Sequence, residues 1–315
     1  MPEIITLTFS PCIDRSMSVP QLLPEKKLKC SVPKLEPGGG GINVARAIKK
    51  LGGDALAVFP SGGYTGKHFN SLLEKEEVPV VIIETKNETR ENIIVLDESA
   101  NVQYRFGTPG TELQESEWEK MLEVVEGMPD RQADGTGLEY IVASGSLPPG
   151  VPLDIYARLA VIAKKKNAKL VVDTSGEALR HAAEEGVYMM KPNLGELGYL
   201  MGIDWIELED VEKIGKKVIA KGYCELLVIS MGKDGAMLIT ENETHRAVPP
   251  VVERKSVVGA GDSMVAGIVL SLSENKSLED VLKFGIACGT AATMNEGTGL
   301  CRKEDVERIF SLLNK

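Results

Sequence analysis

Residues 256–264 read Ser256-Val257-Val258-Gly259-Ala260-Gly261-Asp262-Ser263-Met264, and the apolar residues after them predict a helix over 261–273. The small residues let the backbone pass close to a ligand, and the backbone amides of Ala260, Gly261 and Asp262 would open that helix. A helix N-terminus has unpaired N–H groups and a partial positive charge, so this segment favours a phosphate. A carboxylate repels phosphate, and we therefore expect Asp262 to accept a proton from a hydroxyl that attacks a phosphoryl group. The alternative is that Asp262 merely caps a buried helix.

A second glycine-rich stretch lies near the N-terminus. Residues 37–48 read Pro37-Gly38-Gly39-Gly40-Gly41-Ile42-Asn43-Val44-Ala45-Arg46-Ala47-Ile48 and predict a loop that opens a helix ending at Gly52-Gly53. The glycines and the Asn43 amide would let the chain approach a polyhydroxyl ligand closely. A plain flexible turn is the alternative, but four consecutive glycines carry a large entropic cost for a turn alone.

Two further loops follow predicted strands. In Lys191-Pro192-Asn193-Leu194-Gly195-Glu196, Asn193 would cap the next helix and Glu196 would complete a capping box. The functional interpretation places Lys191 and Asn193 near nucleotide phosphates and Glu196 on Mg²⁺ through water. The second loop supplies amides that could hold another phosphate group, although a glycine-containing hairpin turn looks similar. It consists of Ser230, Met231, Gly232, Lys233, Asp234 and Gly235.

Most of the chain alternates between strand and helix patterns. The first strand begins at residue 4 and is expected to end near Asp14. Further strands are expected at 55–59, 140–143, 169–173, 187–191, 225–230, 236–240 and 244–248, and helices at 66–74, 115–126, 152–166, 176–185, 194–201, 208–221, 261–273, 278–294 and 303–313. Repeated strand–helix units predict a mainly parallel sheet with helices on both faces. Residues 16–35 and 78–106 contain strand patterns with little helix between them, and they predict a separate β-sheet.

Composition limits the possible partners. The 315 residues suit one large α/β domain or two domains. The net charge of −10, with no Lys/Arg-rich run, argues against nucleic acid or an anionic membrane surface as the main partner. A phosphorylated small molecule needs only a local basic pocket. The five cysteines are scattered and no apolar run approaches 18 residues, so we expect a reduced, cytoplasmic protein that does not span a membrane.

The common nucleotide-binding loops do not match. Gly66-Lys67 resembles the end of a P-loop, but Ser61 stands where the first glycine belongs and His68 replaces Ser or Thr. No G-x-G-x-x-G opens a helix after a strand, so a dinucleotide fold is not supported. The three histidines lie outside the glycine motifs, which argues against histidine base chemistry and a His-rich metal site.

These motifs, in this order, resemble the ribokinase-like (phosphofructokinase-B) family of carbohydrate kinases. The resemblance covers essentially the whole chain, residues 1–315, because 38–45 is similar to the first family signature and 258–264 to the second. Further stretches resemble the sugar-phosphate branch: Thr8-x-x-Pro11-x-x-Asp14, residues 36–47, and Ser144-Gly145-Ser146-Leu147-Pro148-Pro149-Gly150. The family implies an α/β fold with a doubly wound, mainly parallel sheet and a small β-sheet lid. Segments of about 16–35 and 78–106 would form that lid, through which related enzymes form homodimers.

The resemblance also implies roles by position. Asp262 would be the catalytic base, and the amides of Gly259, Ala260 and Gly261 would form the anion hole for the transferred phosphoryl group. Sugar hydroxyls would bind to Asp14, Gly39, Gly40 and Asn43, and the phosphate already on the sugar to Lys27, Arg90, Arg105 and Ser146. ATP would bind to Lys191, Asn193 and the 230–235 loop, and Glu196 would serve Mg²⁺ through water. A potassium site would rely on backbone oxygens around Ser256, Val258, Ala292, Asn295 and Gly297, because Ser256-Val257-Val258 replaces the common Asp-Thr-Thr.

The implied reaction is phosphoryl transfer from Mg-ATP to the free primary hydroxyl of fructose 6-phosphate. A kinase for tagatose 6-phosphate or fructose 1-phosphate is an alternative that shares nearly all these motifs. Ribokinase or a nucleoside kinase fits less well, because those substrates bring no phosphate for Arg90 and Lys27. An alternative from another class is a catalytically silent regulator that binds a sugar phosphate, against which the intact Asp262 and anion hole argue.

Overall fold

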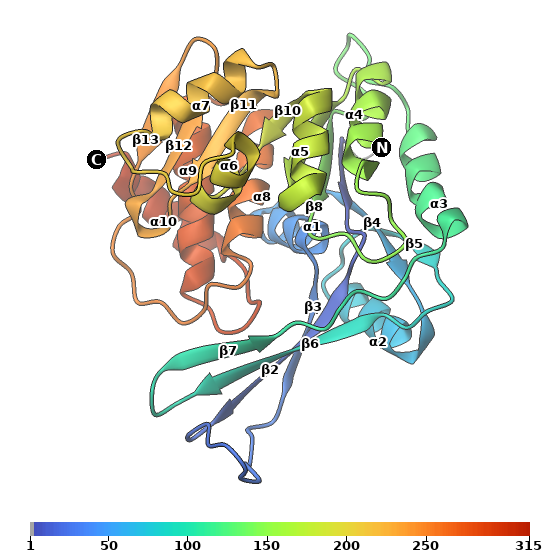
Figure 1. Ribbon diagram of the computed structural model, residues 1–315, viewed down its shortest axis with the longest axis vertical. Coiled ribbons are helices and arrows are strands. Elements are labelled where there is room, and N and C mark those ends of the chain that lie inside the picture. Colours follow the sequence, from blue (N-terminus) through green and yellow to red (C-terminus); the bar gives the residue numbers. More distant parts are fainter. Residues whose placement is uncertain (1–2) are drawn as a thin grey trace.

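The structure is a computed structural model that describes residues 3–315. Within these residues the strands form two sheets, one of nine strands in the order β13-β12-β11-β10-β9-β8-β1-β4-β5 and one of four strands in the order β3-β2-β6-β7 (Figure 1). The strands of the large sheet are β1 (Ile4–Leu7), β4 (Leu56–Ser61), β5 (Val80–Glu84), β8 (Tyr140–Ser144), β9 (Lys169–Asp173), β10 (Val187–Met190), β11 (Cys224–Ser230), β12 (Ala236–Ile239) and β13 (Thr244–Ala247). The strands of the small sheet are β2 (Cys12–Val19), β3 (Lys34–Gly38), β6 (Arg90–Asp97) and β7 (Val102–Phe106).

The helices follow most of the strands of the large sheet. They are α1 (Gly40–Leu51), α2 (Gly63–Glu74), α3 (Glu115–Glu126), α4 (Ile155–Lys165), α5 (Gly176–Glu185), α6 (Leu194–Met201), α7 (Val211–Ala220), α8 (Ala260–Ser273), α9 (Leu278–Thr293) and α10 (Lys303–Leu313), with a 3₁₀ turn, η1, at Gly232–Asp234. The expected helices 115–126, 176–185, 194–201 and 303–313 agree with the structure at both ends. In residues 3–315, none of these helices has the length and apolar character needed to cross a bilayer.

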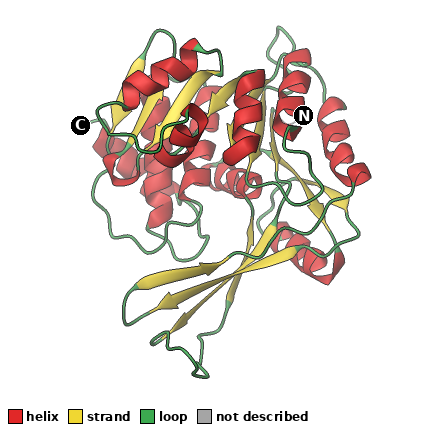
Figure 2. Ribbon diagram, viewed as in Figure 1, coloured by secondary structure: helices red, strands yellow, loops and turns green. Residues whose placement is uncertain are grey.

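The large sheet is parallel from β5 to β11, and β12 and β13 continue it in antiparallel fashion. Successive strand residues point to opposite faces of a sheet, so each face has its own core. Ile4 packs in the core formed with α1, α8 and α9, whereas Ile5 packs in the core formed with α3, α4 and α5. Helices therefore cover both faces, which confirms the predicted three-layer α/β fold (Figure 2).

The small sheet extends away from these layers (Figure 1). β2 pairs in parallel with β6 along its whole length, and β3 and β7 flank this pair in antiparallel orientation. Residues directly opposite each other in β6 and β7 share a face, and one face carries the exposed Ile93, Tyr104 and Phe106 side chains. A separate β-sheet was predicted, and the structure contains one.

The boundaries of the small sheet differ from the predicted ones. The prediction for 78–106 is wrong for β5, because a strand–helix–strand unit of β4, α2 and β5 places β5 parallel to β4 in the large sheet. The prediction for 16–35 is also inexact, since β2 begins at Cys12, β3 ends at Gly38 and the residues between these strands form a loop. The first strand does not reach Asp14: β1 ends at Leu7 and Asp14 lies in β2, which belongs to the small sheet.

Candidate active site

The predicted site residues lie at the carboxyl ends of the parallel strands and at the first turns of α1 and α8. The chain order reverses between β1 and β8, since β1 leads to β4 on one side and β8 pairs with its other side. Open α/β sheets bind their ligands at such a reversal. The first turn of α1 packs there, because a Cβ at Gly40 would lie 2.3 Å from Ser144 Oγ and 2.7 Å from the Gly145 backbone nitrogen.

The four consecutive glycines bring α1 close to its neighbours. A Cβ at Gly38 would lie 2.5 Å from Asp14 Oδ2, and a Cβ at Gly41 would lie 2.4 Å from the Leu7 carbonyl oxygen. Gly39 has φ +117°, a backbone conformation that other residues rarely adopt. The run therefore packs α1 tightly against the end of β1 and against Asp14, and it is not a loose turn.

Asp262 is the third residue of α8, and it does not cap that helix. The N-cap is Gly259, with φ 73°, and no side chain makes the capping hydrogen bond. The Asp262 side chain is half-buried, and its Oδ2 accepts a hydrogen bond of 2.9 Å from Asn43 Nδ2 on α1. Within residues 3–315 the backbone N–H groups of Gly261 and Asp262 have no acceptor, as expected for the first turn of a helix, whereas the N–H of Ala260 donates to the Val257 carbonyl at 3.4 Å. This turn offers N–H donors to an anion beside a carboxylate.

The pKa of Asp262 is raised to about 7. Burial is the largest cause because it disfavours the charged form, and the negative charges of Asp173 and Asp14 act in the same direction. The hydrogen bond from Asn43 and the positive charge of Lys191 oppose the increase. A carboxyl group that titrates near neutral pH is suited to accept a proton during a reaction.

Asp14 is buried in β2 on the small-sheet side of the site. Its Oδ1 accepts hydrogen bonds from Asn92 Nδ2 at 3.1 Å and from Cys12 Sγ at 3.4 Å, and its Oδ2 accepts one from Thr298 Oγ1 at 2.9 Å. Burial and the Asp14 carboxylate raise the pKa of the Cys12 thiol well above its ordinary value. Asp14 is thus held rigidly as a hydrogen-bond acceptor at the base of the small sheet.

Arg90 begins β6 and lies beside Asp14, because the register pairs Cys12 with Arg90 and Asp14 with Asn92. Its guanidinium donates to the Thr108 carbonyl at 2.9 Å, to the Ser10 carbonyl at 3.1 Å and to Asn92 Oδ1 at 3.2 Å. Its Nε is buried and has no partner in the described part of the chain. A guanidinium carries five N–H donors, so one Nη2 N–H remains for a ligand, whereas the Nε N–H is buried without a partner among the described residues.

Three other residues predicted to hold the sugar's phosphate do not join this group. Lys27, Arg105 and Ser146 are exposed, and none forms a hydrogen bond with Arg90 or Asp14. The loop 20–33, which carries Lys27, lies at the end of the small sheet remote from α8 (Figure 1). Their binding roles stay predictions.

Lys191 follows β10 on the other side of Asp262. Its Nζ forms a buried ion pair of 3.1 Å with Asp173 Oδ1 at the end of β9. Burial, the largest single effect, would lower the pKa of the Lys191 ammonium. The charge and hydrogen bond of Asp173, together with the charges of Glu196 and Asp262, outweigh burial, so the pKa is raised. A Cβ at Gly261 would lie 3.6 Å from Lys191 Nζ, so a fixed positive charge lies beside the first turn of α8.

The predicted nucleotide loops lie next to each other. Asn193 and Ser230 form an isolated parallel bridge, and the Ser230 N–H donates to the Pro192 carbonyl at 3.0 Å. Asn193 caps α6: its Oδ1 accepts from the Glu196 N–H at 2.9 Å, and Glu196 Oε2 accepts from the Asn193 N–H at 2.8 Å. The predicted capping box is therefore present. Residues 230–235 include η1, where Gly232 and Lys233 are exposed; the flanking residues Met231 and Gly235 are buried.

Two carboxylates near Lys191, those of Asp173 and Glu196, are of the type that binds a divalent cation. Burial and the charge of Asp173 raise the pKa of Glu196, although its hydrogen bond from Asn193 opposes this. Two carboxylates that repel each other gain from a cation between them, and Mg²⁺ is commonly bound by one or two carboxylates together with substrate phosphates. Residues 3–315 contain no cluster of three or more His, Cys, Asp or Glu side chains arranged for a metal.

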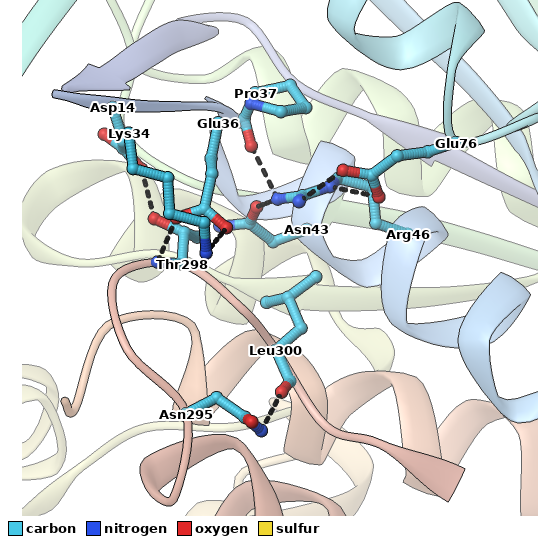
Figure 3. Close-up of polar contacts among 10 residues, drawn as sticks. All are labelled: Asp14, Lys34, Glu36, Pro37, Asn43, Arg46, Glu76, Asn295, Thr298 and Leu300. Atoms are coloured by element: carbon cyan, nitrogen blue, oxygen red, sulfur yellow. Dashed lines mark hydrogen bonds and ion pairs between the residues drawn. The ribbon is translucent and has the colours of Figure 1, made fainter. Parts of the chain in front are cut away.

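The predicted potassium loops are joined by backbone hydrogen bonds. The N–H groups of Lys255 and Ser256 donate to the Thr293 carbonyl at 2.8 and 3.2 Å. The buried Asn295 Nδ2 donates to the Leu300 carbonyl at 2.8 Å and closes the second loop (Figure 3). The structure brings the Ser256–Val258 and Ala292–Gly297 segments together, and their use by a cation stays a prediction.

A family model described as "pfkB family carbohydrate kinase" matches residues 7–305. The chain belongs to the pfkB family of carbohydrate kinases. Relatives and structures agree with this assignment over the full length. The chain is 43% identical over 320 residues to the ATP-dependent 6-phosphofructokinase isozyme 2 of Escherichia coli strain K12, with all of both chains covered. It is 31% identical over 296 residues to the 1-phosphofructokinase of Bacillus subtilis strain 168, with 94% of each covered.

Solved structures show the same fold. A crystal structure of phosphofructokinase-2 from Escherichia coli in complex with substrates and products superposes on this pfkB kinase with a TM-score of 0.94, 43% identity, and coverage of 99% of this chain and 100% of that chain. The same E. coli enzyme has been crystallised in complex with potassium (TM-score 0.94, 43% identity, full coverage of both chains). A structure of its tetrameric inhibited form also matches (TM-score 0.92, 42% identity, full coverage of both chains).

The site of this pfkB kinase contains side chains that sequence reasoning did not single out. Asp173 pairs with Lys191, and Glu36 Oε2 accepts a hydrogen bond of 3.0 Å from the Thr298 N–H (Figure 3). Arg46 hydrogen-bonds to Asn43 (Figure 3). Their positions in the predicted elements could have indicated two of these residues. Asp173 ends a predicted parallel strand, and Arg46 lies three residues after Asn43 on the same helix face.

Proposed function

We propose that this pfkB kinase is an ATP-dependent 6-phosphofructokinase, which phosphorylates the free primary hydroxyl of fructose 6-phosphate. The observation that carries the proposal is the Asp262 carboxyl group. It lies in the first turn of α8, accepts a hydrogen bond from Asn43 and has a pKa of about 7. The identity to the E. coli 6-phosphofructokinase isozyme 2, over the full length of both chains, supports the choice of substrate.

In the proposed reaction the hydroxyl oxygen of the sugar forms a bond to the terminal phosphorus of ATP. The bond from that phosphorus to the bridging oxygen breaks, and ADP leaves with the electron pair. Asp262 accepts the hydroxyl proton as the new bond forms. The N–H groups of Gly259, Ala260 and Gly261 stabilise the charge on the transferred group, so positioning and electrostatics supply most of the catalysis.

The two substrates approach Asp262 from opposite sides. Asp14, Gly39, Gly40 and Asn43 hold the sugar hydroxyls, since they surround the junction of β2 and α1. Arg90, with Lys27, Arg105 and Ser146, binds the phosphate that the sugar already carries. ATP lies over the ends of β10 and β11, with its phosphates near Lys191, Asn193 and residues 230–235. This proposed position of the ATP phosphates is supported by the ion-paired ammonium group of Lys191, which lies beside the first turn of α8.

Two cations would assist these groups. Mg²⁺ would be held by Asp173 and Glu196 and would neutralise the charge of the ATP phosphates when bound. K⁺ would bind to backbone oxygens around Ser256, Val258, Ala292, Asn295 and Gly297. The E. coli phosphofructokinase-2 crystallised in complex with potassium supports this second site.

The apolar face of the small sheet supports a proposal about assembly. Phe106 is 52% exposed and Ile93 and Tyr104 share its face, so a second copy of the chain would cover apolar surface there. We propose a homodimer through this sheet, which would act as a lid on the sugar site. The tetrameric inhibited form of the E. coli enzyme makes higher assembly a second possibility. An ATP-consuming kinase of central sugar metabolism would act in the cytoplasm.

A substrate panel tests the function. Initial rates with Mg-ATP are measured for fructose 6-phosphate, tagatose 6-phosphate, fructose 1-phosphate and fructose, with Asp262→Asn as the blank. The proposal expects the highest kcat/KM with fructose 6-phosphate. A higher kcat/KM with fructose 1-phosphate would favour the activity named for the B. subtilis relative. No turnover with any sugar would favour a non-catalytic regulator that binds a sugar phosphate.

A further inference from the structure

Arg46 is a charged side chain that the proposed mechanism does not use, although it is only 2% exposed. It lies on α1, and its guanidinium lies between Asn43 on the same helix and Glu76, two residues after α2 (Figure 3). Its Nε and Nη2 donate to the two carboxylate oxygens of Glu76 at 2.9 and 2.6 Å. Its Nη1 donates to the Pro37 carbonyl at 2.6 Å and to Asn43 Oδ1 at 3.1 Å. Every nitrogen of the guanidinium is therefore engaged by a fixed partner.

These contacts determine which way the Asn43 amide faces. An amide has an acceptor oxygen and a donor nitrogen, and the network around it decides their positions. With its oxygen toward Arg46, Asn43 presents Nδ2 to Asp262 Oδ2 at 2.9 Å. The reversed amide would place N–H groups against the guanidinium and its oxygen against the carboxylate. Both contacts would then be repulsive.

We infer that Arg46 is a positioning residue, held by Glu76, which fixes the Asn43 amide so that its N–H groups face the Asp262 carboxylate. This inference rests on the proposed function, in which Asp262 is the base. It deepens the role predicted for Asn43: the amide oxygen and one N–H are already used within the protein. One N–H of Asn43 then remains for a sugar hydroxyl.

The contacts that run from Glu76 through Arg46 and Asn43 to Asp262, called the relay below, also predict how the pH profile of kcat/KM changes in a variant. The charged and polar groups that act on Asp262 are Asp14 from β2, Asp173 from β9, Lys191 after β10 and Asn43 from α1. Among them, the Asn43 hydrogen bond favours the ionised form and lowers the pKa of Asp262. Loosening Asn43 removes that effect, so the pKa of Asp262 rises. The base is then protonated over a wider pH range, and the acidic limb of the kcat/KM profile moves upward.

Two variants that keep every charge test the relay. Arg46→Lys preserves the positive charge but cannot reach Glu76, Pro37 and Asn43 together. Glu76→Asp shortens a carboxylate that is 26% exposed, so it is the milder change for folding. We expect kcat to fall by about 10- to 100-fold in Arg46→Lys and by a few-fold in Glu76→Asp, because small misplacements of catalytic groups are costly. The acidic limb should rise by about half a pH unit or more in the first variant and less in the second, with KM for ATP within about twofold of wild type.

The matched control is Asp54→Glu. Asp54 pairs at 3.0 Å with Lys49, another positively charged residue of α1, on the exposed surface. The substitution lengthens this carboxylate side chain by one methylene and keeps its charge. This control should leave kcat and the acidic limb unchanged. A structural clamp alone would lower stability or activity without moving the limb, and an unmoved limb in both relay variants would overturn the inference. If Arg46→Lys does not fold, Glu76→Asp decides.

The role of Arg46 can also be tested if the wild type has no kinase activity. Such a result would reject the proposed function but not the role of Arg46. The pKa of Asp262 is then followed by NMR in protein labelled with ¹³C at the aspartate carboxyl carbon, with the signal assigned by its loss in Asp262→Asn. The expected result is a higher pKa of Asp262 in Arg46→Lys and Glu76→Asp than in wild type and Asp54→Glu. Equal pKa values in all four proteins would contradict the relay.

Discussion

The charge of Asp262 should reduce the stability of this protein at the pH where the enzyme works. The folded state raises the pKa of this carboxyl group to about 7 from the ordinary aspartate value of 3.8. Between those two values the folded protein holds a proton that the unfolded chain has lost. Because the folded state binds more protons, this group's stabilising contribution is present at low pH and is lost as the pH rises toward 7.

Asp262→Asn removes this titration with almost no change in shape. Between pH 5 and pH 7 the full effect is about 3 kcal/mol, since one pKa unit corresponds to about 1.4 kcal/mol. The side chain is half-buried and retains some water, so we expect about 1–2 kcal/mol. The free energy of unfolding of Asp262→Asn relative to wild type should therefore increase by that amount from pH 5 to pH 8.

Urea denaturation of both proteins at pH 5, 6, 7 and 8 measures this difference. Carboxylates remote from Asp262 titrate equally in both proteins, so subtraction leaves the titration of Asp262 together with its coupling to Asp14 and Asp173. If the difference between variant and wild type stays constant across this pH range, the folded state does not raise the pKa of Asp262.

Three further substitutions address the neighbouring groups. Arg90→Ala should raise KM for fructose 6-phosphate far more than KM for ATP, because the Arg90 guanidinium has a free Nη2 donor and a positive charge for the sugar's phosphate. Steady-state kinetics with each substrate varied would show an unchanged KM if the phosphate binds elsewhere. Thr298→Val removes the hydrogen bond to Asp14 Oδ2, so KM for the sugar phosphate should rise several-fold and stability should fall by about 1–2 kcal/mol, with Thr298→Ser restoring both. Glu196→Gln should raise the Mg²⁺ concentration needed for half-maximal activity. It should lower the free energy of unfolding, measured by urea denaturation, by less than about 1 kcal/mol. An unaltered Mg²⁺ dependence would mean that Glu196 does not belong to the metal site.

The fold could be predicted from the sequence where local signals and tertiary structure agree. The α6 boundaries follow from the Asn193 cap and the Gly202 residue that ends the helix in a left-handed conformation. β5 was assigned to the wrong sheet because its residues, Val80–Glu84, resemble those of a small-sheet strand. The preceding strand and helix were the better guide, since such a unit returns the chain to a parallel neighbour in the same sheet.

The site was predictable where a motif is continuous in sequence. Gly259–Asp262 and Gly39–Asn43 each form one turn of backbone, so their neighbours along the chain define their geometry. Thr298 and Asp14 are 284 residues apart in sequence, and only the packed fold shows that they share a hydrogen bond. The same is true of Arg46 and Glu76, whose contact requires the fold to bring the segment after α2 within reach of the Arg46 side chain.

In the proposed mechanism Asp262 takes the proton from the sugar hydroxyl. The most direct measurement compares the turnover of Asp262→Asn with that of wild type, using Mg-ATP and fructose 6-phosphate, while calorimetry measures ATP binding to both. We expect kcat to fall by about 10²- to 10⁴-fold with ATP affinity retained, because general base catalysis contributes that much. Turnover near the wild-type rate in a variant that binds ATP normally would contradict this mechanism.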